Sequence, residues 1–523
     1  MVSPGPTIEG WMASRRRKRA LGRQQLIVAL IAVFIIICVV IFSTNLMKPS
    51  GTPAKVALAN NRDYFPAVHA MIGGAQRSVD VILYQSRFYF EYPLSTSNTL
   101  ITDLVDAKER GVRVRVIFEI ADWNFENSED NRDVWNVLDQ AGVETYFDPA
   151  TTTSHSKLLV IDGRYSVVGS MNWSYYALDK NYEATAIIDS PKIADRFDSY
   201  FDAVLRTCTP TYALPISYMT ASEMLASKES NVFVRDVADS GHYTAPDTVG
   251  TIYVGPLTFF VDEDALQEVL AVDSLFFAHV RGDTLRIYGR VGKGDRHFVH
   301  AVDIEASGTR QAMAKNFAAE RTAMKSVSVP KPVLTWTSSP RVVPIPNELY
   351  APEVGKLIRG AQRRIWVAML DARYYETAPG PPEEAAQKKA KGAPPSLTNL
   401  MLEDLQAAAR RGVDVRLVID TSREGRMPPT KTAFLSMLKE AGGKVFEDPP
   451  DITTHAKVMI VDDDFTVVGS TNWSQPAVEE NNETAVVIES PEVNKVYAAF
   501  IEADEAQGKP YEPAPAAPSI GTR

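Results

Sequence analysis

The sequence predicts a mixed α/β protein made of two similar halves, with a small β-rich segment between them and a transmembrane helix at the N-terminus. Three observations predict this arrangement. One polar motif occurs twice, strand-like and helix-like segments alternate around each copy, and an uncharged apolar run lies near the start of the chain. At 523 residues the chain is also too long for a single hydrophobic core.

The expected divisions follow from these patterns. They are a basic N-terminus (1–25), a transmembrane segment (26–47), a first half (55–209), a β-rich segment of unknown role (210–335), a second half (336–505) and a disordered Pro/Ala-rich tail (506–523).

The transmembrane prediction rests on Leu26–Phe42, which contains 17 apolar residues and no charge. Extended to Met47, the run has the length that a bilayer core requires. The basic cluster Arg15–Arg23 precedes it, so the positive-inside rule predicts a single-pass protein with a cytoplasmic N-terminus and an extracytoplasmic body. A cleaved signal peptide has similar features, but the nearest small-x-small pattern, Ala57-Leu58-Ala59, lies far beyond the run. A retained anchor is therefore favoured.

Charge and cysteine content exclude some classes of function. The chain has 55 Lys and Arg against 65 Asp and Glu, and the basic cluster at the N-terminus makes the remaining body more acidic still. Such a body is not suited to broad contact with a polyanion. The two cysteines are Cys38, in the apolar run, and Cys208, so neither an internal disulfide of the body nor a structural zinc site is expected.

Within each half, apolar strands alternate with helical segments, which predicts an α/β sandwich. The helices expected in the two halves are 64–73, 100–110, 132–141, 352–359, 397–411 and 430–441. Strand pairs are expected on either side of Asp162-Gly163 and of Asp462-Asp463-Asp464. Further strands are expected in the β-rich segment at 251–260, 274–281, 284–291 and 297–304, and the Pro/Ala/Lys-rich stretch 377–396 is expected to be a surface loop.

The repeated motif carries the chemistry. It reads His155-Ser156-Lys157, then Asp162 and Gly169-Ser170-Met171-Asn172, and the second copy repeats it in register from His455. Two imidazoles on facing halves can cleave a phosphodiester, because one attacks phosphorus while the other protonates the departing oxygen. The candidate catalytic residues are His155, His455, Lys157, Lys457, Asn172, Asn472, Glu183 and Glu483.

Each type of residue has an expected role. The two lysines and two asparagines would hold the non-bridging phosphate oxygens, so the chemistry requires neither a metal nor a cofactor. The two glutamates would accept the Nδ1 proton of a histidine and fix its tautomer. The remaining motif residues, Asp162, Asp462, Ser170 and Ser470, are predicted to be structural.

The two segments HSKLLVIDGRYSVVGSMNWS and HAKVMIVDDDFTVVGSTNWS resemble the paired HxK-x4-D-x6-GSxN signature of the phospholipase D superfamily. The resemblance covers about residues 66–205 and 351–500. It implies a pseudo-symmetric fold with one site between the halves and a metal-independent mechanism through a phosphohistidine. It also implies that His155 is the nucleophile and His455 the acid and base, although the residues themselves leave the reverse assignment open.

The motif does not select a substrate. An anchor beside a bilayer and an acidic body favour a phospholipid substrate at a membrane, with water or an alcohol as the acceptor. The alternatives are a nuclease acting on single-stranded DNA or RNA, a cardiolipin synthase-like phosphatidyltransferase, and a membrane-tethered protein that only binds phosphoryl groups. The resemblance leaves the synthase in doubt, since such enzymes usually have two hydrophobic N-terminal segments and this sequence has one. The oligomeric state is left open.

Overall fold

The computed structural model describes residues 51–89, 92–121, 124–149, 151–209, 328–375, 396–421 and 427–513, together with Arg321 and six strands between residues 232 and 305. All of the helices and strands in these ranges belong to the unit Thr52–Arg523. The predicted anchor 26–47, the basic N-terminus, residues 377–395 of the predicted loop and the tail beyond 513 lie outside the described residues. Within these ranges, no helix has the length and apolar character needed to cross a membrane.

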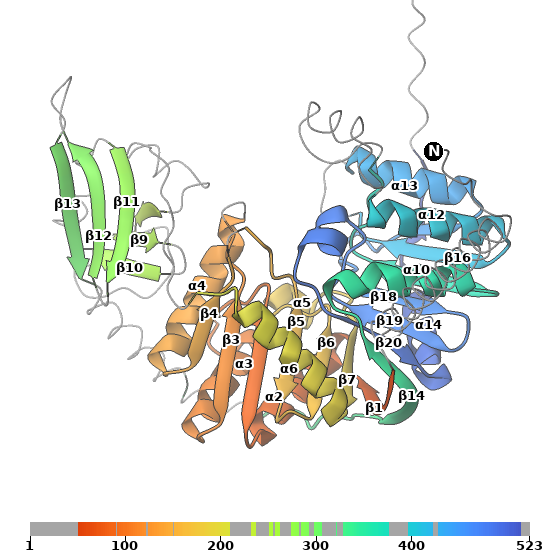
Figure 1. The fold of residues 1–523 in the computed structure, drawn as a ribbon, viewed down its shortest axis with the longest axis horizontal. Helices are drawn as coiled ribbons and strands as arrows, with labels where there is room; N and C mark the ends of the chain where they lie inside the picture. The colour runs from red at the N-terminus through yellow and green to blue at the C-terminus, as the bar shows by residue number, and fades with distance from the viewer. Residues whose placement is uncertain are drawn as a thin grey trace, which may run out of the picture. The chain divides into compact units, whose positions relative to one another are not determined.

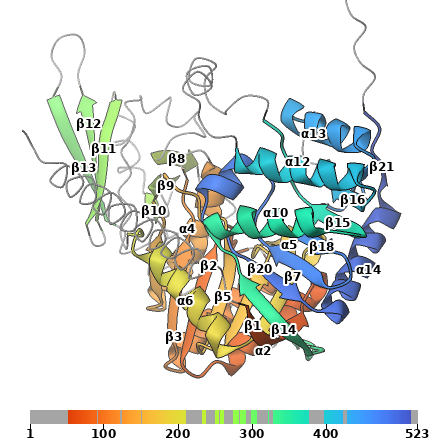
Figure 2. The ribbon, with the colours of Figure 1, turned by 45° about the vertical axis from the view of Figure 1, so that its right-hand side comes forward.

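One sheet of 15 strands runs through both halves. At its centre, β1 (Thr52–Leu58) pairs antiparallel with β14 (Thr337–Pro344). On its other side, β1 pairs with β7 (Thr185–Asp189), and β14 likewise pairs with β20 (Ala485–Glu489), as Figures 1 and 2 show. The two halves are therefore joined by continuous backbone hydrogen bonds.

The first half has the predicted alternation of strands and helices. Its elements are η1 (Asn61–Asp63), α2 (Tyr64–Gly74), β2 (Ser78–Leu83), α3 (Thr96–Glu109), β3 (Arg113–Phe118), α4 (Phe125–Gln140), β4 (Glu144–Phe147), β5 (Lys157–Ile161), β6 (Tyr165–Gly169), α5 (Tyr175–Asp179), β7 and α6 (Pro191–Leu205). Strands β2, β3 and β4 are parallel, whereas β5 runs antiparallel to β2.

The second half repeats this order. After β14 it contains η3 (Asn347–Leu349), α10 (Tyr350–Gly360), β15 (Arg364–Met369), α12 (Leu397–Arg410), β16 (Asp414–Ile419), α13 (Pro429–Glu440), β17 (Lys444–Glu447), β18 (Lys457–Val461), β19 (Phe465–Gly469), η4 (Pro476–Glu480), β20, α14 (Pro491–Gln507) and β21 (Lys509–Pro510). The disorder predicted from residue 506 is wrong for its first part, because α14 runs to Gln507 and β21 pairs with β17.

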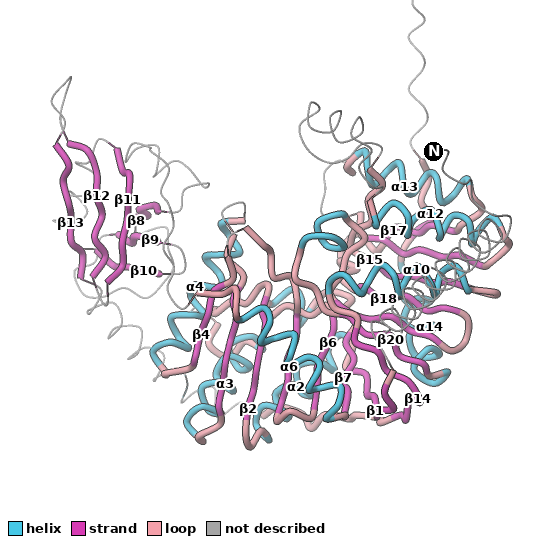
Figure 3. The backbone as a smooth tube through the Cα atoms, in the orientation of Figure 1, coloured by secondary structure: helices cyan, strands magenta, loops and turns pink. Residues whose placement is uncertain are grey.

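Helices cover both faces of the sheet (Figure 3), so its strands are apolar on both sides. In β2, Val79, Val81 and Leu83 pack in a core formed with α2, α3 and α4 of the first half. The intervening Ile82 faces a second core beneath α6 and α14, which contains apolar residues of both halves. This shared core and the β1–β14 pairing together fix one half against the other.

The β-rich segment contributes two further sheets of three strands. The predicted strands 274–281 and 284–291 are confirmed as β11 (Ser274–Arg281) and β12 (Thr284–Val291), which pair with each other. β12 also pairs with β13 (Phe298–Glu305), close to the strand predicted at 297–304. The single strand predicted at 251–260 is wrong. It is two paired strands, β9 (Gly250–Val254) and β10 (Leu257–Val261), and β9 also pairs with β8 (Val232–Asp236).

The aspartate of each motif lies at the end of its strand that is remote from the histidine. Asp162 follows β5, and its carboxylate accepts hydrogen bonds from the backbone N–H groups of Gln76, Arg77 and Ser78. Asp462 binds the N–H groups of residues 362–364 in the same way. Both aspartates have a positive φ, +57° and +50°, which short polar side chains tolerate better than most. These residues stabilise the turns and do not contact the histidines.

Replacing Asp462 by Ala is therefore expected to lower the free energy of unfolding by about 2–4 kcal/mol, because three N–H groups lose their acceptor and alanine disfavours a positive φ. The matched control is Asp463→Ala, which removes half-exposed ion pairs with Arg363 and Arg364 and should cost about 0–1 kcal/mol. Urea unfolding measures both. Equal losses for the two variants would contradict this role for Asp462.

Candidate active site

Each HxK segment lies at the carboxyl ends of the parallel strands of its own half. Lys157 begins β5 and is paired with Leu83, the last residue of β2, while Lys457 begins β18 and is paired with Met369. The carboxyl ends of the parallel strands β2 and β3 therefore meet the start of β5. Clefts for ligands commonly form at this edge of α/β sheets.

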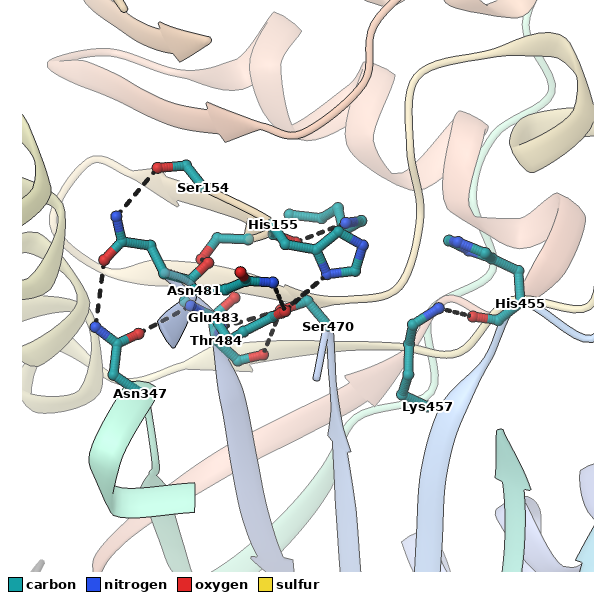
Figure 4. A network of polar contacts seen from close by, with 12 residues as sticks. Ser154, His155, Asn347, His455, Lys457, Ser470, Asn481, Glu483 and Thr484 are labelled. Atoms are coloured by element: carbon teal, nitrogen blue, oxygen red, sulfur yellow. Dashed lines mark hydrogen bonds and ion pairs between the residues drawn. The ribbon is translucent and has the colours of Figure 1, made fainter. Parts of the chain in front are cut away.

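Each histidine is hydrogen-bonded to a glutamate of the opposite half. The Nδ1 atom of His155 lies 2.9 and 3.0 Å from the two carboxylate oxygens of Glu483 (Figure 4). The Nδ1 atom of His455 lies 2.9 Å from the Glu183 carboxylate. All four side chains are buried. One site is thus assembled from both halves, with its two histidine–glutamate pairs crossing between them.

The glutamates are themselves held in matching ways. Ser170 donates a hydrogen bond to Glu183, and Ser470 does the same for Glu483. The structure therefore places these serines behind the glutamates, where they support the carboxylates.

Two pairs of asparagines that the sequence reasoning missed complete this support. The side-chain amides of Asn181 and Asn481 donate to the same glutamates, at 3.2 and 3.3 Å. Asn61 and Asn347 accept the backbone N–H groups of Glu183 and Glu483, each at 2.8 Å. A signal was present in the sequence, because Asn181 and Asn481 precede the two glutamates by the same interval.

The two lysines point back toward their own histidines. The Nζ atom of Lys157 donates to the His155 carbonyl at 2.6 Å, and Lys457 makes the same bond to His455. Both lysines are 3% exposed. Burial lowers the pKa of Lys157 well below its usual range, against the charge of Glu483, which raises it. An ammonium group has three donors, so each lysine can also bind an anion within the site.

Charged groups of each half shift the pKa values of groups in the other half. Burial lowers the pKa of His155 to about 4; Glu483 opposes the shift, and the ammonium groups of Lys157 and Lys457 reinforce it. Burial also raises the pKa of Glu183 to about 7, against the charges of Lys457 and Lys157. The His155 imidazole is therefore mainly neutral above about pH 4, including at neutral pH.

Asn172 and Asn472 follow β6 and β19, at the ends of these strands that lie beside the HxK segment of the same half. The Oδ1 atoms of both are buried, and neither has a hydrogen-bond partner within the described part of the chain. Buried polar atoms are normally paired. The oxygen and nitrogen of a side-chain amide are assigned from their surroundings, so the unpaired atom is one of the two. One end of each amide is therefore left without a partner in this part of the chain and can bind a ligand.

Two further aspartates hold the segments that lead to the histidines. Asp148 accepts hydrogen bonds from the N–H groups of Ile120 and Ser154, both at 2.8 Å. Asp448 accepts from those of Thr421 and Thr454, both at 3.0 Å. Each therefore ties the residue before a histidine to the end of a parallel strand. The repeat of Asp-Pro at 148 and 448 was the available signal, but their role depended on contacts that only the fold reveals.

Glu119 is a further buried acid near the site, and sequence reasoning missed it as well. It follows β3, is 0% exposed and accepts a hydrogen bond from Asn127 at 2.7 Å. Burial raises its pKa to about 8, with Asp148 adding to the shift and Lys157 opposing it.

Among the residues that the structure describes, no three His, Cys, Asp or Glu side chains gather in a way that could hold a metal ion.

Comparison with known proteins agrees with the repeat. The family profile described as "Cardiolipin synthase, PLD-like domain" matches residues 68–205 and 384–504. A mitochondrial cardiolipin hydrolase of Chlamydomonas reinhardtii is 28% identical over 132 residues, which are 25% of this chain and 52% of that protein. A phospholipase D of Rickettsia bellii is 28% identical over 102 residues, 19% of this chain and 48% of that protein. The chain spans about half the length of these relatives.

Two solved structures also match parts of the chain. A phosphatidylserine synthase of Haemophilus influenzae is 12% identical, with 90% of each chain covered and a TM-score of 0.46. The phospholipase D family member Nuc of Salmonella typhimurium is 26% identical, with 33% of this chain and 96% of that chain covered and a TM-score of 0.25. From its two matched domains, this chain contains two phospholipase D-like domains and belongs to the phospholipase D superfamily.

Proposed function

We propose that this protein is a phospholipase D-type phosphodiesterase that hydrolyses or transfers phosphatidyl groups through a phosphohistidine intermediate. The observation that carries the proposal is the crossed pairing of His155 with Glu483 and of His455 with Glu183. With Nδ1 of each ring bound to a carboxylate, chemistry runs through Nε2. A protein that only bound phosphoryl groups would not need two histidines oriented in this way.

The first step cleaves the ester. Nε2 of neutral His155 attacks phosphorus and forms a P–N bond, while the P–O bond to the leaving alcohol breaks. Protonated His455 gives its Nε2 proton to the departing oxygen, so the alcohol leaves uncharged. The Glu183 carboxylate favours the protonated form of His455 before this transfer.

The second step reverses the roles. Neutral His455 takes a proton from water or from an acceptor alcohol, whose oxygen attacks phosphorus as the P–N bond breaks. This releases a phosphatidic acid or a new phosphodiester and restores neutral His155. Throughout, Lys157, Lys457 and the amides of Asn172 and Asn472 stabilise the charge that develops on the non-bridging oxygens.

The relatives named as cardiolipin hydrolase and phospholipase D support a lipid substrate. An exposed apolar cluster supports the same choice. It comprises Tyr92, Leu94, Tyr175 and Tyr176, which are 67%, 54%, 43% and 68% exposed. Such a concentration of large exposed apolar side chains is typical of contact with another apolar surface.

This cluster belongs to the edge of the sheet where the site lies. The segment with Tyr92 and Leu94 follows β2, and α5 begins three residues after Asn172. Tyr89 links the two parts, since its hydroxyl accepts the Tyr175 N–H at 2.8 Å and its carbonyl accepts the Tyr92 N–H at 3.1 Å.

The charges around the cluster are balanced. Arg87 forms an ion pair with Asp130. Lys180 lies over the Tyr175 ring and directly follows Asp179, the last residue of α5, so a carboxylate neighbours this cation in the sequence. A track for a nucleic acid would need an excess of cations, whereas tyrosines and a leucine with balanced charge suit the interface of a bilayer. We therefore propose that this cluster contacts the membrane that contains the substrate. The predicted anchor 26–47 would hold the site beside such a membrane.

The activity is tested with the purified full-length chain, given phospholipid vesicles and single-stranded oligonucleotides in parallel with EDTA present. Release of a head group is expected, and His155→Ala should reduce it at least about a thousandfold, because it removes the nucleophile. Cleavage of the oligonucleotide with intact lipid would identify a nuclease and refute the lipid assignment. Binding of lipid without turnover would refute the enzyme assignment altogether.

The membrane contact is tested by a Tyr92→Ser/Tyr176→Ser variant. Turnover of vesicle lipid is expected to fall about tenfold relative to turnover of a soluble chromogenic diester, corresponding to about 1.4 kcal/mol of lost surface binding. The control is Val496→Ser, which removes an apolar side chain of 49% exposure from α14. An equal ratio of the two activities in all three proteins would contradict the proposed membrane contact.

A further inference from the structure

One of the differences between the two halves of the site lies at the strand end beside each HxK segment. Tyr84 directly follows β2, whose last residue is paired with Lys157. The equivalent position after β15 is Leu370, since Met369 is paired with Lys457. The pseudo-symmetry thus places an aromatic side chain beside one HxK segment and an aliphatic side chain at the matching place beside the other.

Tyr84 contacts the histidine and the lysine of the HxK segment in its half. Its ring meets the His155 imidazole edge-on, with ring centroids 4.5 Å apart and an interplanar angle of 68°. The Nζ atom of Lys157 lies over the same ring, 4.5 Å from its centroid. One side chain therefore packs against the imidazole and binds the ammonium group by a cation–π interaction.

The position of Tyr84 is fixed by neighbouring amides. Its hydroxyl lies 3.2 Å from the Asn124 amide, and its backbone carbonyl accepts hydrogen bonds from Asn127 at 2.8 Å and Asn131 at 2.9 Å. In the second half, the Leu370 carbonyl is bound instead by the ammonium group of Lys431, at 3.3 Å. The support of this position therefore also differs between the halves.

We propose that Tyr84 is a positioning residue that keeps His155 neutral as the nucleophile, by packing against its imidazole and holding the neighbouring Lys157. The inference rests on the proposed phosphodiesterase function. His455, whose half has Leu370 at the matching position of the sheet, would then serve as the acid and base.

The physical reason is desolvation. A ring packed against an imidazole excludes water and makes its charged form less stable, which agrees with the pKa of about 4 that burial gives His155. The charged groups that act on this imidazole are Glu483 of the opposite half, which favours the charged form, and Lys157 and Lys457, which disfavour it. Removing the ring should let water reach the imidazole and raise its pKa toward the ordinary value near ~6.5.

The test compares Tyr84→Leu, which makes the first half resemble the second, with Tyr84→Phe, which keeps the ring. Hydrolysis of bis(p-nitrophenyl) phosphate by the full-length chain is followed from about pH 4 to 9, since the acidic limb of kcat/KM reports the ionisation of the nucleophile in the free enzyme. In Tyr84→Leu this limb should move to higher pH, with about a tenfold loss near pH ~5 relative to wild type. In Tyr84→Phe and in a Leu370→Ala control it should stay in place.

Titration of His155 by ¹⁵N NMR provides a readout that needs no turnover. Its pKa should rise in Tyr84→Leu and stay low in Tyr84→Phe. An unchanged titration in Tyr84→Leu, or a loss of rate that is equal at every pH, would overturn the proposal. If the leucine variant does not unfold cooperatively, Tyr84→Met takes its place. A wild-type protein that leaves the diester intact would refute the proposed function, while the titration would still decide the role of Tyr84.

Discussion

The site depends on the hydrogen bonds that cross between the halves. His155 is oriented by Glu483 and His455 by Glu183, so each histidine of the site depends on a glutamate of the other half. The relative position of the halves must therefore be fixed to within hydrogen-bond tolerance. The antiparallel pairing of β1 with β14 and the shared apolar core under α6 and α14 provide this rigidity. The fold and the proposed chemistry thus require the same interface.

The interface between the halves also has an electrostatic consequence. Two histidines, two lysines and two glutamates are buried together, and burying charge is costly unless partners compensate for it. The serines and asparagines behind the glutamates supply part of that compensation. The arrangement is preorganised for a phosphodiester, whose negative charge would complement the two ammonium groups. Burial of these charges lowers the stability of the fold, but it gives a site whose groups already have the geometry that the reaction requires.

Much of this was predictable from the sequence, and the missing parts have physical reasons. The repeated motif and the alternating periodicity predicted the two α/β halves and the residues gathered at the site. The crossing of the glutamates was not predictable, because Glu183 and Glu483 follow their motifs by equal intervals and could pair within or between halves. Tyr84 and Asp148 were missed because their roles arise from contacts between strand ends. The anchor at 26–47 stays a prediction.

The structure joins the two halves in one site, where His155 is proposed to become covalently bound to phosphorus. A His455→Asn variant with bis(p-nitrophenyl) phosphate tests this directly, because p-nitrophenolate leaves without a proton from His455. The variant is quenched with acid-free denaturant during the reaction, and its peptides are analysed by mass spectrometry. Without a base to activate water, the second step should stall, and a p-nitrophenyl phosphoryl group should accumulate on the peptide that contains His155. The absence of an adduct, or an adduct on any other peptide, would show that His155 is not the nucleophile.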